Sequence, residues 1–527
     1  AAKGGAEEAK GAEDAAAGGD EGKTDVDSFG AEMVEETETG VDSGAGEQTS
    51  EIILAAQQAE RILNSADLET SLNLVERAVQ QNLFHEKQLR YRECPVGDEA
   101  LLATTSTANG AAGGDAAAAA AVNLDAALGD GGSQADSLTT NGAVKPNLKN
   151  LFTFECEFTA GRTVTSMVWN RVNKDILAVG YGEFQSSENA GGLVLFWSLR
   201  NPQFPERVLD IPSGVTAVDF SSKMPNLLAV GMYDGTVAIY NLRKDQSDLK
   251  APVLESGNLP GKHMDPVWQV KWIDKGPERG ETLVSISTDG RVVEWSMKKG
   301  LSSHSLMVLK RIGNSDGIIS RQASGLSFDF PQGDSSMYYA GTEDGYIHRC
   351  SCSYNEQYLD TYTGHTGPVY RIRCSPFWPT AFLSCSADWT VKLWTHEQQE
   401  FVQQFHSVDL SDVVHDIAWS PTTSTIFGSV TGDGRVEIWD LSVSMLDPVV
   451  CLFSDGTKNN VLEFDDEPED KGVECPAQTS ILFSDTEPVL AVGDETGVVR
   501  VYQIGGLDLT PDLPVQAQID RLKGCMA

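Results

Sequence analysis

Basic residues are scarce in this chain of 527 residues. Only 39 lysine and arginine residues stand against 77 aspartate and glutamate residues, and the formal net charge is -38 at pH 7. A folded protein this acidic repels phosphate groups, which argues against a general nucleic-acid binder or a binder of anionic membranes. The sequence also lacks any run of 18 apolar residues, so it predicts no helix that spans a bilayer.

Cysteine and catalytic motifs are sparse as well. The nine cysteines form an odd number without paired spacing, which favours free thiols in a reducing, intracellular setting. There is no Walker loop, no dinucleotide fingerprint after a strand, no EF-hand loop and no Gly-x-Ser-x-Gly elbow. We therefore predict no catalytic residues, no cofactor-binding residues and no metal ligands.

Two low-complexity segments and a short tail are predicted outside the repeats. Residues 1–48 form an acidic head, and residues 1–50 hold fourteen acidic residues against three lysines. Such a composition cannot bury enough apolar surface to offset the entropy of ordering, so we expect this head to be disordered. Residues 94–148, rich in alanine and glycine, are expected to be a flexible linker, and residues 506–527 a C-terminal tail.

Residues 49–93 differ from their surroundings because apolar residues recur at three- and four-residue steps. Such spacing predicts two amphipathic helices, weakened between them at Asn64-Ser65. The first stripe includes Ile52, Ala55, Ala56, Ala59, Ile62 and Leu63, and the second consists of Leu68, Leu72, Val75, Val79 and Leu83. These helices either fold back on the following domain or dock, as helices in grooves, on separate small subunits.

A repeated pattern fills residues 149–505. Seven segments share an apolar strand, a turn and a second alternating strand that ends on an aromatic residue or its substitute: Ile176–Trp197, Leu227–Tyr240, Leu283–Trp295, Met337–Cys350, Phe382–Trp394, Ile426–Trp439 and Val489–Tyr502. Most of the turns are Asp-Gly pairs, a strong hairpin signal. The chain is thus expected to be all-β, a seven-bladed WD-type β-propeller preceded by a mostly disordered region with one or two amphipathic helices.

Closing this ring requires that the first and last blades share strands. Leu151–Phe158 alternates just before the first blade and is predicted to supply the outer strand of the last blade. Residues 451–475, rich in aspartate and glutamate, are predicted to be an exposed insertion between the sixth and seventh blades.

One blade carries a polar set that resembles catalytic machinery. It consists of His365, Ser384, Ser386, Asp388 and Trp394. A hydrolase is one interpretation. The spacing favours the other, a structural network in which the turn aspartate bonds the histidine, which bonds a strand hydroxyl and then the tryptophan.

His348, Cys350 and Cys352 alternate along one strand and present three soft ligands on one face. A zinc site is possible in principle, but Cys350 stands where other blades have tryptophan or tyrosine, so core filling is favoured.

A less generic run lies between the second and third blades. It contains Asp265, Pro266, Trp268 and Trp272. These residues are either core and turn, or a propeller edge that faces a partner, and we take the second as the hypothesis.

Several runs resemble the dynein intermediate chains, and within them the axonemal branch. They are Asp265–Trp272 with Ser287–Gly290, Ala178–Gly182, Asn201–Glu206, Val230–Leu242, Gly341–Gly345 and Gln357–Tyr362. The resemblance covers residues 151–505 and points to the outer-arm intermediate chain of type one. Before the propeller, Glu47–Ser50 and Ala55–Asn64 resemble the helix that docks a roadblock-type light chain in this family.

This resemblance implies a non-catalytic scaffold of the axonemal outer dynein arm, needed for arm assembly, docking and ciliary beating. The propeller would hold the dynein heavy chain at the edge named above, and the helices of residues 49–93 would hold roadblock-type and Tctex-type light chains. A second intermediate chain is a further implied partner. The implied location is the axoneme of a cilium or flagellum, after pre-assembly in the cytoplasm, with the arm docked on the doublet microtubule.

Direct contact with tubulin would need a basic patch on this acidic chain. The candidates are Lys298, Lys299, Lys310, Arg311, Arg371 and Arg373; the favoured interpretation is solvated surface. The alternative function is a WD-repeat adaptor of another assembly, in ciliary transport or as a substrate receptor. An enzyme would need a polar pocket in the central channel.

Overall fold

The computed structural model describes residues 58–63, 65–92, 139–140, 143–144, 146–182, 191–244, 250–298, 300–312, 322–407, 412–453, 475–507, 509 and 513–526. The chain divides into two units, Ala1–Leu72 and Asn73–Ala527. Of the predicted segments, the acidic head, most of the linker and residues 454–474 of the predicted insertion 451–475 lie outside the described residues, and the first three residues of that insertion belong instead to a strand that ends at Phe453.

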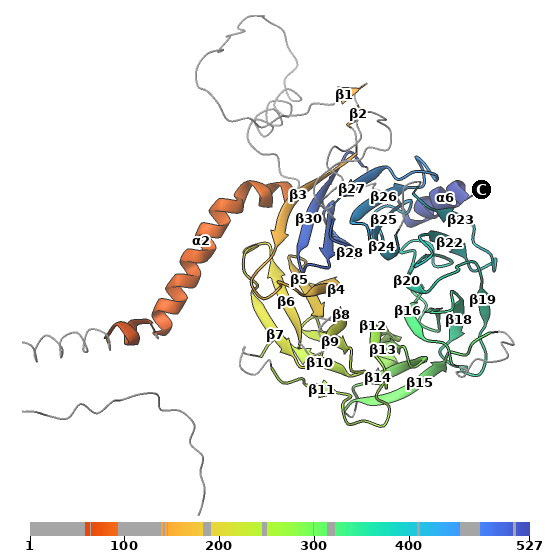
Figure 1. Cartoon of the computed structure of the whole chain (residues 1–527), viewed down its shortest axis with the longest axis horizontal. Helices are drawn as coiled ribbons and strands as arrows, with labels where there is room; N and C mark the ends of the chain where they lie inside the picture. Colours follow the sequence, from red (N-terminus) through yellow and green to blue (C-terminus); the bar gives the residue numbers. More distant parts are fainter. Residues whose placement is uncertain are drawn as a thin grey trace, which may run out of the picture. The chain divides into compact units, whose positions relative to one another are not determined.

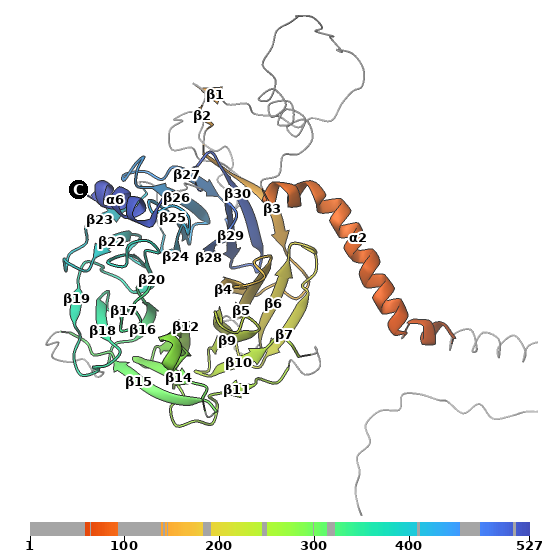
Figure 2. The same cartoon turned by 180° about the vertical axis from the view of Figure 1, so that it is seen from behind.

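Seven four-stranded antiparallel sheets follow one another around a ring in the second unit (Figures 1 and 2). The prediction of a seven-bladed propeller is confirmed. Each predicted segment supplies the two middle strands of one blade. Gly235, Gly290, Gly345 and Gly434 turn between these strands at positive φ, which explains why glycine follows aspartate there.

The strands of the first four blades, from the innermost outward, run in chain order. Blade 1 is β4 (Thr163–Trp169), β5 (Ile176–Gly182), β6 (Gly192–Ser198) and β7 (Arg207–Ile211). Blade 2 is β8 (Val215–Phe220), β9 (Leu227–Met232), β10 (Val237–Asn241) and β11 (Leu254–Glu255). Blade 3 is β12 (Val267–Asp274), β13 (Glu281–Ser287), β14 (Arg291–Ser296) and β15 (Ser302–Val308). Blade 4 is β16 (Gly325–Asp329), β17 (Met337–Thr342), β18 (Ile347–Ser351) and β19 (Asp360–Tyr362).

The last three blades complete the ring. Blade 5 is β20 (Val369–Cys374), β21 (Ala381–Ser386), β22 (Val391–Thr395) and β23 (Gln403–Phe405). Blade 6 is β24 (Val414–Trp419), β25 (Ile426–Thr431), β26 (Arg435–Asp440) and β27 (Val450–Phe453). Blade 7 takes β28 (Gln478–Phe483), β29 (Val489–Asp494) and β30 (Val499–Gly505) from the end of the repeats, and its outer strand β3 (Asn147–Phe154) from their beginning.

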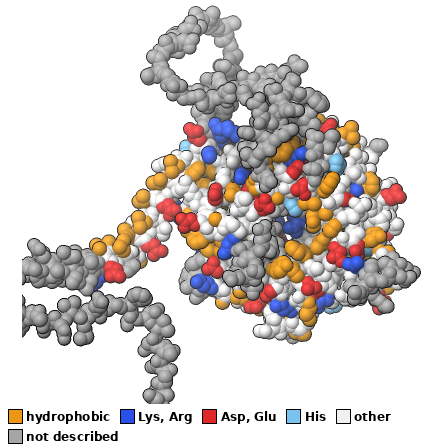
Figure 3. Space-filling model, in the orientation of Figure 1, with side chains coloured by type: hydrophobic (Ala, Val, Ile, Leu, Met, Phe, Trp, Pro, Cys, Tyr) orange, Lys and Arg blue, Asp and Glu red, His pale blue; other side chains and the backbone are white. Residues whose placement is uncertain are grey.

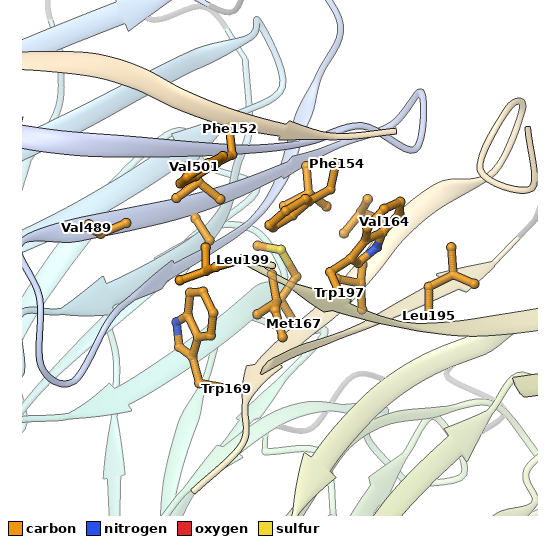
Figure 4. Close-up of a cluster of buried hydrophobic side chains, with 14 of the residues drawn as sticks. Phe152, Phe154, Val164, Met167, Trp169, Leu195, Trp197, Leu199, Val489 and Val501 are labelled. Carbon is orange, nitrogen blue, oxygen red and sulfur yellow. The ribbon is translucent and has the colours of Figure 1, made fainter. Parts of the chain in front are cut away.

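The pairing of β3 with β30 closes the ring, as the sequence predicted, although the strand begins four residues earlier than Leu151. Phe154 stacks on Trp197 of blade 1 with ring centroids 5.2 Å apart. Figure 4 shows Phe152, Phe154 and Val501 of blade 7 beside Trp197 and Val164 of blade 1 in one buried cluster. The joint between the two ends of the repeat array is therefore filled by a continuous apolar core.

Helices lie on either side of the repeats in the sequence. The helix α2 (Ala66–Tyr91) begins after Ser65, whose Oγ accepts the N–H of Leu68 at 3.3 Å, and this cap agrees with the predicted break at Asn64-Ser65. A short helix, α5 (Gly276–Arg279), lies within blade 3, and a small hairpin, β1 (Thr139–Thr140) with β2 (Ala143–Val144), precedes β3. None of the described helices is both long and apolar enough to cross a membrane.

The C-terminal segment, expected to be only a tail, contains the helix α6 (Val515–Met526). Its Gln518 is buried, accepts the N–H of Ser424 at 3.1 Å and donates to the carbonyl of Thr422 at 3.2 Å. Leu522 is also buried, in the core that blades 5 and 6 share. The helix α6 is thus packed on the propeller at blades 5 and 6.

Candidate partner-binding surfaces

The polar set of blade 5 forms a chain of hydrogen bonds. His365 Nδ1 lies 2.9 Å from Asp388 Oδ2, and His365 Nε2 lies 2.7 Å from Ser384 Oγ. Trp394 Nε1 donates to the same Ser384 Oγ at 2.7 Å. One neutral histidine with its proton on Nδ1 satisfies every group, since the serine hydroxyl then donates to Nε2 and accepts from the indole. Ser386 Oγ donates to the carbonyl of Gly367 at 3.0 Å.

Electrostatics in this network favour a charged aspartate beside a neutral histidine. Burial alone would raise the pKa of the Asp388 carboxyl, but the hydrogen bonds from His365, Thr390 and Thr366 hold that pKa well below its usual range. Burial lowers the pKa of His365, against the opposing effect of Asp388. Ser384 is fully buried and already paired, so the geometry offers no exposed nucleophile.

Blade 3 contains a second network of the same kind, which sequence reasoning missed. His263 Nδ1 lies 3.0 Å from Asp289 Oδ2 and His263 Nε2 lies 2.8 Å from Ser285 Oγ. Trp295 Nε1 donates to Ser285 Oγ at 2.8 Å, across the same ten-residue separation as between Ser384 and Trp394. That shared serine-to-tryptophan spacing was the signal in the sequence.

His348, Cys350 and Cys352 pack in the core of blade 4. His348 stacks on Tyr358 with ring centroids 3.8 Å apart, and Cys350 is fully buried. Burial raises the pKa of the Cys350 thiol to about 12 and that of the Cys352 thiol to about 11. No group of metal-ligating side chains occurs among the residues that the structure describes.

The hypothesised partner edge is only partly at the surface. Asp265 is exposed, and Pro266 and Trp268 are half-buried. Trp272 does not belong to this edge, because it is only 5% exposed and lies in the core between blades 2 and 3. Its indole Nε1 donates to the carbonyl of Asp219 at 3.2 Å, and its backbone N–H donates to Asp219 Oδ2 at 2.8 Å.

Charged residues line a central cavity of about 320 Å³ between the inner strands. Arg371 and Arg373, named above as candidates for a basic patch, line it and lie 3.6 and 3.7 Å from Asp416 Oδ1. Arg311 lies at an ion-pair distance from Glu343, and Lys299 is outside the described residues. Arg371 and Arg373 therefore belong to the central cavity and not to an exposed basic surface.

Polar side chains fix one face of α2 on blade 1. Asn201 Nδ2 donates to Glu76 Oε1 at 2.8 Å, and Gln80 Nε2 donates to Gln203 Oε1 at 2.8 Å. Arg77 adds an ion pair with Glu206 at 3.5 Å. The helix α2 thus packs on the run from Asn201 to Glu206, which is also part of the family resemblance.

Aromatic contacts anchor the end of α2 on the closing strand. Phe84 and Tyr91 lie with ring centroids 6.2 and 6.3 Å from that of Phe152 in β3. Tyr91 is only 1% exposed. The helix therefore packs at the point where the ring closes.

The apolar stripe predicted on α2 points away from these contacts. Val75, Val79 and Leu83 are 58%, 48% and 66% exposed, and Figure 3 shows hydrophobic side chains in a row along the helix. We call these three residues the exposed stripe of α2. One face of α2 therefore folds back on the propeller, while the exposed stripe is open to solvent.

The predicted docking residues of the first helix are only partly described. Ala59, Ile62 and Leu63 are exposed in the helical residues 58–63. Ile52, Ala55 and Ala56 lie outside the described residues.

Comparison with known proteins agrees with this geometry. The family model "WD domain, G-beta repeat" matches residues 205–241, 356–395 and 400–440. The fold and these repeats define a WD40-type β-propeller protein.

More specific relatives are found among the dyneins. Dynein axonemal intermediate chain 4 of Rattus norvegicus is 42% identical over 85% of this chain and 54% of its own length. Dynein, 78 kDa intermediate chain, flagellar outer arm, of Chlamydomonas reinhardtii is 34% identical over 71% of this chain and 52% of its own length. Dynein axonemal intermediate chain 1 of Bos taurus is 34% identical over 69% and 49%.

The chain belongs to the axonemal dynein intermediate chain family, and it spans about half the length of the curated relatives it matches. These relatives do not specify the outer-arm type-one member that the sequence runs resemble. Membership implies a location in the axoneme of a cilium or flagellum. The family match is not to a catalytic family.

Proposed function

We propose that this chain is a non-catalytic scaffold subunit of an axonemal dynein arm. The propeller would hold the tail of a dynein heavy chain, and the N-terminal helices would hold light chains of the roadblock and Tctex types. A second intermediate chain would complete the subcomplex and raise the effective concentration of each partner. The proposal includes no catalytic step, since the serine and histidine residues of the blade networks are buried and paired.

The observation that supports this proposal is the division of labour on α2. An amphipathic helix that packs on its own domain usually buries its apolar stripe. In α2 it is the other face that contacts the propeller, through hydrogen bonds and through Phe84 and Tyr91. The exposed stripe of α2 is left as an apolar surface on a helix whose other face contacts the propeller, which suits a helix-in-groove partner. We extend the same role to Ile52, Ala55, Ala56, Ala59, Ile62 and Leu63 in the first helix.

The light-chain assignment is tested with the full chain and purified roadblock-type and Tctex-type dynein light chains. Val79→Asp with Leu83→Asp is expected to abolish co-elution of the light chain that uses α2, because two charges enter an apolar contact. Ile62→Asp with Leu63→Asp is the corresponding change in the first helix. Gln81→Asp with His85→Asp is the matched control, since both positions are exposed and lie on a different side of the helix from the stripe. If both light chains still co-elute with both stripe variants, the assignment is wrong.

The heavy-chain assignment is tested by co-purifying the full chain from axonemes. The expected result is a complex with a dynein heavy chain. In a second experiment the chain is removed, and loss of outer-arm subunits but not of inner-arm subunits would support the outer-arm placement. Recovery without any heavy chain, or with a different multi-protein assembly, would replace this proposal by the WD-repeat adaptor.

A further inference from the structure

Every inner strand of the propeller contains a β-bulge at the same place. In each pairing with the second strand of the blade, one residue near the start of the inner strand is left without a partner. The bulged residues, from blade 1 to blade 7, are Thr165, Thr216, Trp268, Leu326, Tyr370, His415 and Thr479. Because the inner strands encircle the centre of the ring (Figures 1 and 2), these seven positions follow one another in a circle, each at the end of its blade where the two middle strands turn.

Blades 7, 1 and 2 fill this circle with threonines whose hydroxyls are already used. Thr165 Oγ1 donates to the carbonyl of Gly180 at 3.0 Å, and Thr479 Oγ1 lies within hydrogen-bonding distance of two carbonyls, the nearer being that of Val164 at 2.6 Å. Thr216 is buried and hydrogen-bonded in the same way. In blades 7, 1 and 2 the bulge positions are therefore occupied by small side chains whose hydroxyl groups already have hydrogen-bond partners.

Blades 3 to 6 instead carry large side chains, all half-buried. We call Trp268, Leu326, Tyr370 and His415 the bulky arc. Three contacts position its rings: Trp268 Nε1 donates to Thr288 Oγ1 at 2.6 Å, Tyr233 packs edge-on against Trp268 with ring centroids 6.5 Å apart, and the ring of Tyr370 stacks on His415 with centroids 5.9 Å apart. Large side chains that are fixed in position and partly open to water lose little conformational entropy on binding.

Trp389 adds an exposed indole at the same end of the blades. It stands in the turn of blade 5 at the position that blades 2, 3, 4, 6 and 7 give to Gly235, Gly290, Gly345, Gly434 and Gly497. It is the one non-glycine residue with positive φ among the described residues, with φ 66°, and its side chain is 44% exposed. Such a backbone costs about 1–3 kcal/mol in a bulky residue, so folding alone favours glycine there. A large exposed side chain kept at a strained position indicates a contact outside the chain.

The charges around the arc select the kind of contact. Asp265 precedes Trp268 by three residues, and Asp412 and Glu495 lie near His415. None of these three carboxylates has an ion-pair partner among the residues that the structure describes. A partner segment that brings lysine or arginine beside its apolar side chains would match them.

We infer that the bulky arc, together with Trp389, binds a basic peptide segment of a partner protein that carries large apolar side chains. This inference deepens the proposed scaffold function, since it places the partner-facing surface on blades 3 to 6 and names the chemistry of the segment held there. Of the edge predicted from the sequence, it retains Trp268 and Asp265.

The experiment selects binders from a phage-displayed library of random 15-residue peptides on the immobilised full chain. We expect enriched peptides with two or more large apolar residues and an excess of lysine and arginine, and weaker binding at higher salt. The selected peptides, made synthetically, are then titrated against variants by fluorescence anisotropy. Trp268→Thr with Tyr370→Thr installs the residue that three other blades use at the bulge, and it should raise the Kd at least tenfold.

Two further variants distinguish a loss of peptide binding from a loss of folding stability. Trp389→Gly should raise the Kd at least threefold while leaving the Tm unchanged or higher, an outcome that a merely structural tryptophan would not give. Thr165→Ser, at the bulge position of blade 1, is the matched control and should bind within twofold of the parent chain.

Enrichment of acidic peptides, no enrichment at all, or equal binding by the arc variants would overturn the inference. Its failure is separate from failure of the scaffold function, because heavy-chain co-purification is measured with the unaltered chain. A heavy chain that co-purifies equally well with the parent chain and with Trp268→Thr/Tyr370→Thr would leave the scaffold function intact and reject the arc as its surface.

Discussion

Ser384 serves two partners at once at the centre of blade 5. Its hydroxyl oxygen accepts from Trp394 and its proton goes to His365. Substituting alanine leaves a buried indole N–H and a buried imidazole nitrogen unpaired, and each such group costs about 1–3 kcal/mol. We expect Ser384→Ala to lower the free energy of unfolding by about 3 kcal/mol, measured by chemical denaturation.

Two variants calibrate that result. Ser285→Ala breaks the equivalent network of blade 3 and should cost a similar amount, whereas Ser302→Ala removes an exposed hydroxyl and should change stability by about 0.5 kcal/mol or less. A Ser384→Ala chain as stable as the Ser302→Ala chain would mean that the network contributes nothing to blade stability.

His348 makes stability depend on pH. Burial lowers its pKa from 6.5 to about 4. As pH falls below 6.5, the unfolded chain takes up a proton that the folded chain does not, so this histidine reduces stability progressively down to pH 4. At pH 5.5 the loss from this group is about 1 kcal/mol.

The measurement compares the free energy of unfolding at pH 7.5 and pH 5.5. His348→Phe retains the ring that stacks on Tyr358, and it should lose about 1 kcal/mol less than the parent chain over this interval. The same loss in both proteins would contradict a neutral, buried His348.

At the scale of single elements, α2 is held by the face that its apolar periodicity does not mark. Tyr91→Ala should therefore loosen the helix although Tyr91 lies outside the stripe. Loss of its packing on Phe152 is expected to lower the free energy of local opening by about 2 kcal/mol. Amide hydrogen exchange across the last turns of α2 should then be roughly thirtyfold faster.

Leu83→Ala is the matched control on the same helix. Its side chain is 66% exposed, so exchange in α2 should stay within about twofold of that of the parent chain. If Leu83→Ala accelerates exchange as much as Tyr91→Ala does, then α2 is not seated by the face described above.

Inner strands show how far sequence patterns reach. Strict alternation would place Trp268 and Trp272, both assigned to the predicted partner edge, on the same side of a strand. The bulge at Trp268 adds a residue and shifts the following side chains, which sends Trp272 into the core. Turns and strands were predictable from Asp-Gly pairs and period two, but a bulge has no comparable local signature.

Helices at the two ends give the same lesson in different ways. Val515, Ile519, Leu522 and Met526 recur at three- and four-residue steps, so α6 carried a signal that the sequence interpretation passed over. The seat of α2 carried none, because Glu76 and Gln80 resemble any solvated helix face until Asn201 and Gln203 are known to lie opposite them.

At the scale of the whole molecule, β3 decides whether the repeats form one body. It provides the outer strand of blade 7, and its Phe152 and Phe154 fill the joint between blades 7 and 1. The aromatic side chain of Phe152 is also a contact of α2. Without β3, β30 would present an unpaired edge and the apolar face of blade 1 would lose its cover. Deleting residues 147–154 from the full chain should therefore cause aggregation and lower the Tm relative to the parent chain, as judged by size-exclusion chromatography and thermal unfolding.

A deletion of equal length in the predicted linker, residues 116–123, separates closure from chain length. It removes eight residues of alanine-rich sequence outside the described part of the chain and should leave the elution volume and Tm unchanged. A monomeric, cooperatively unfolding protein after removal of 147–154 would show that the propeller closes by other contacts. In that case the contact between α2 and Phe152 would not connect the proposed light-chain helix to the stability of the propeller.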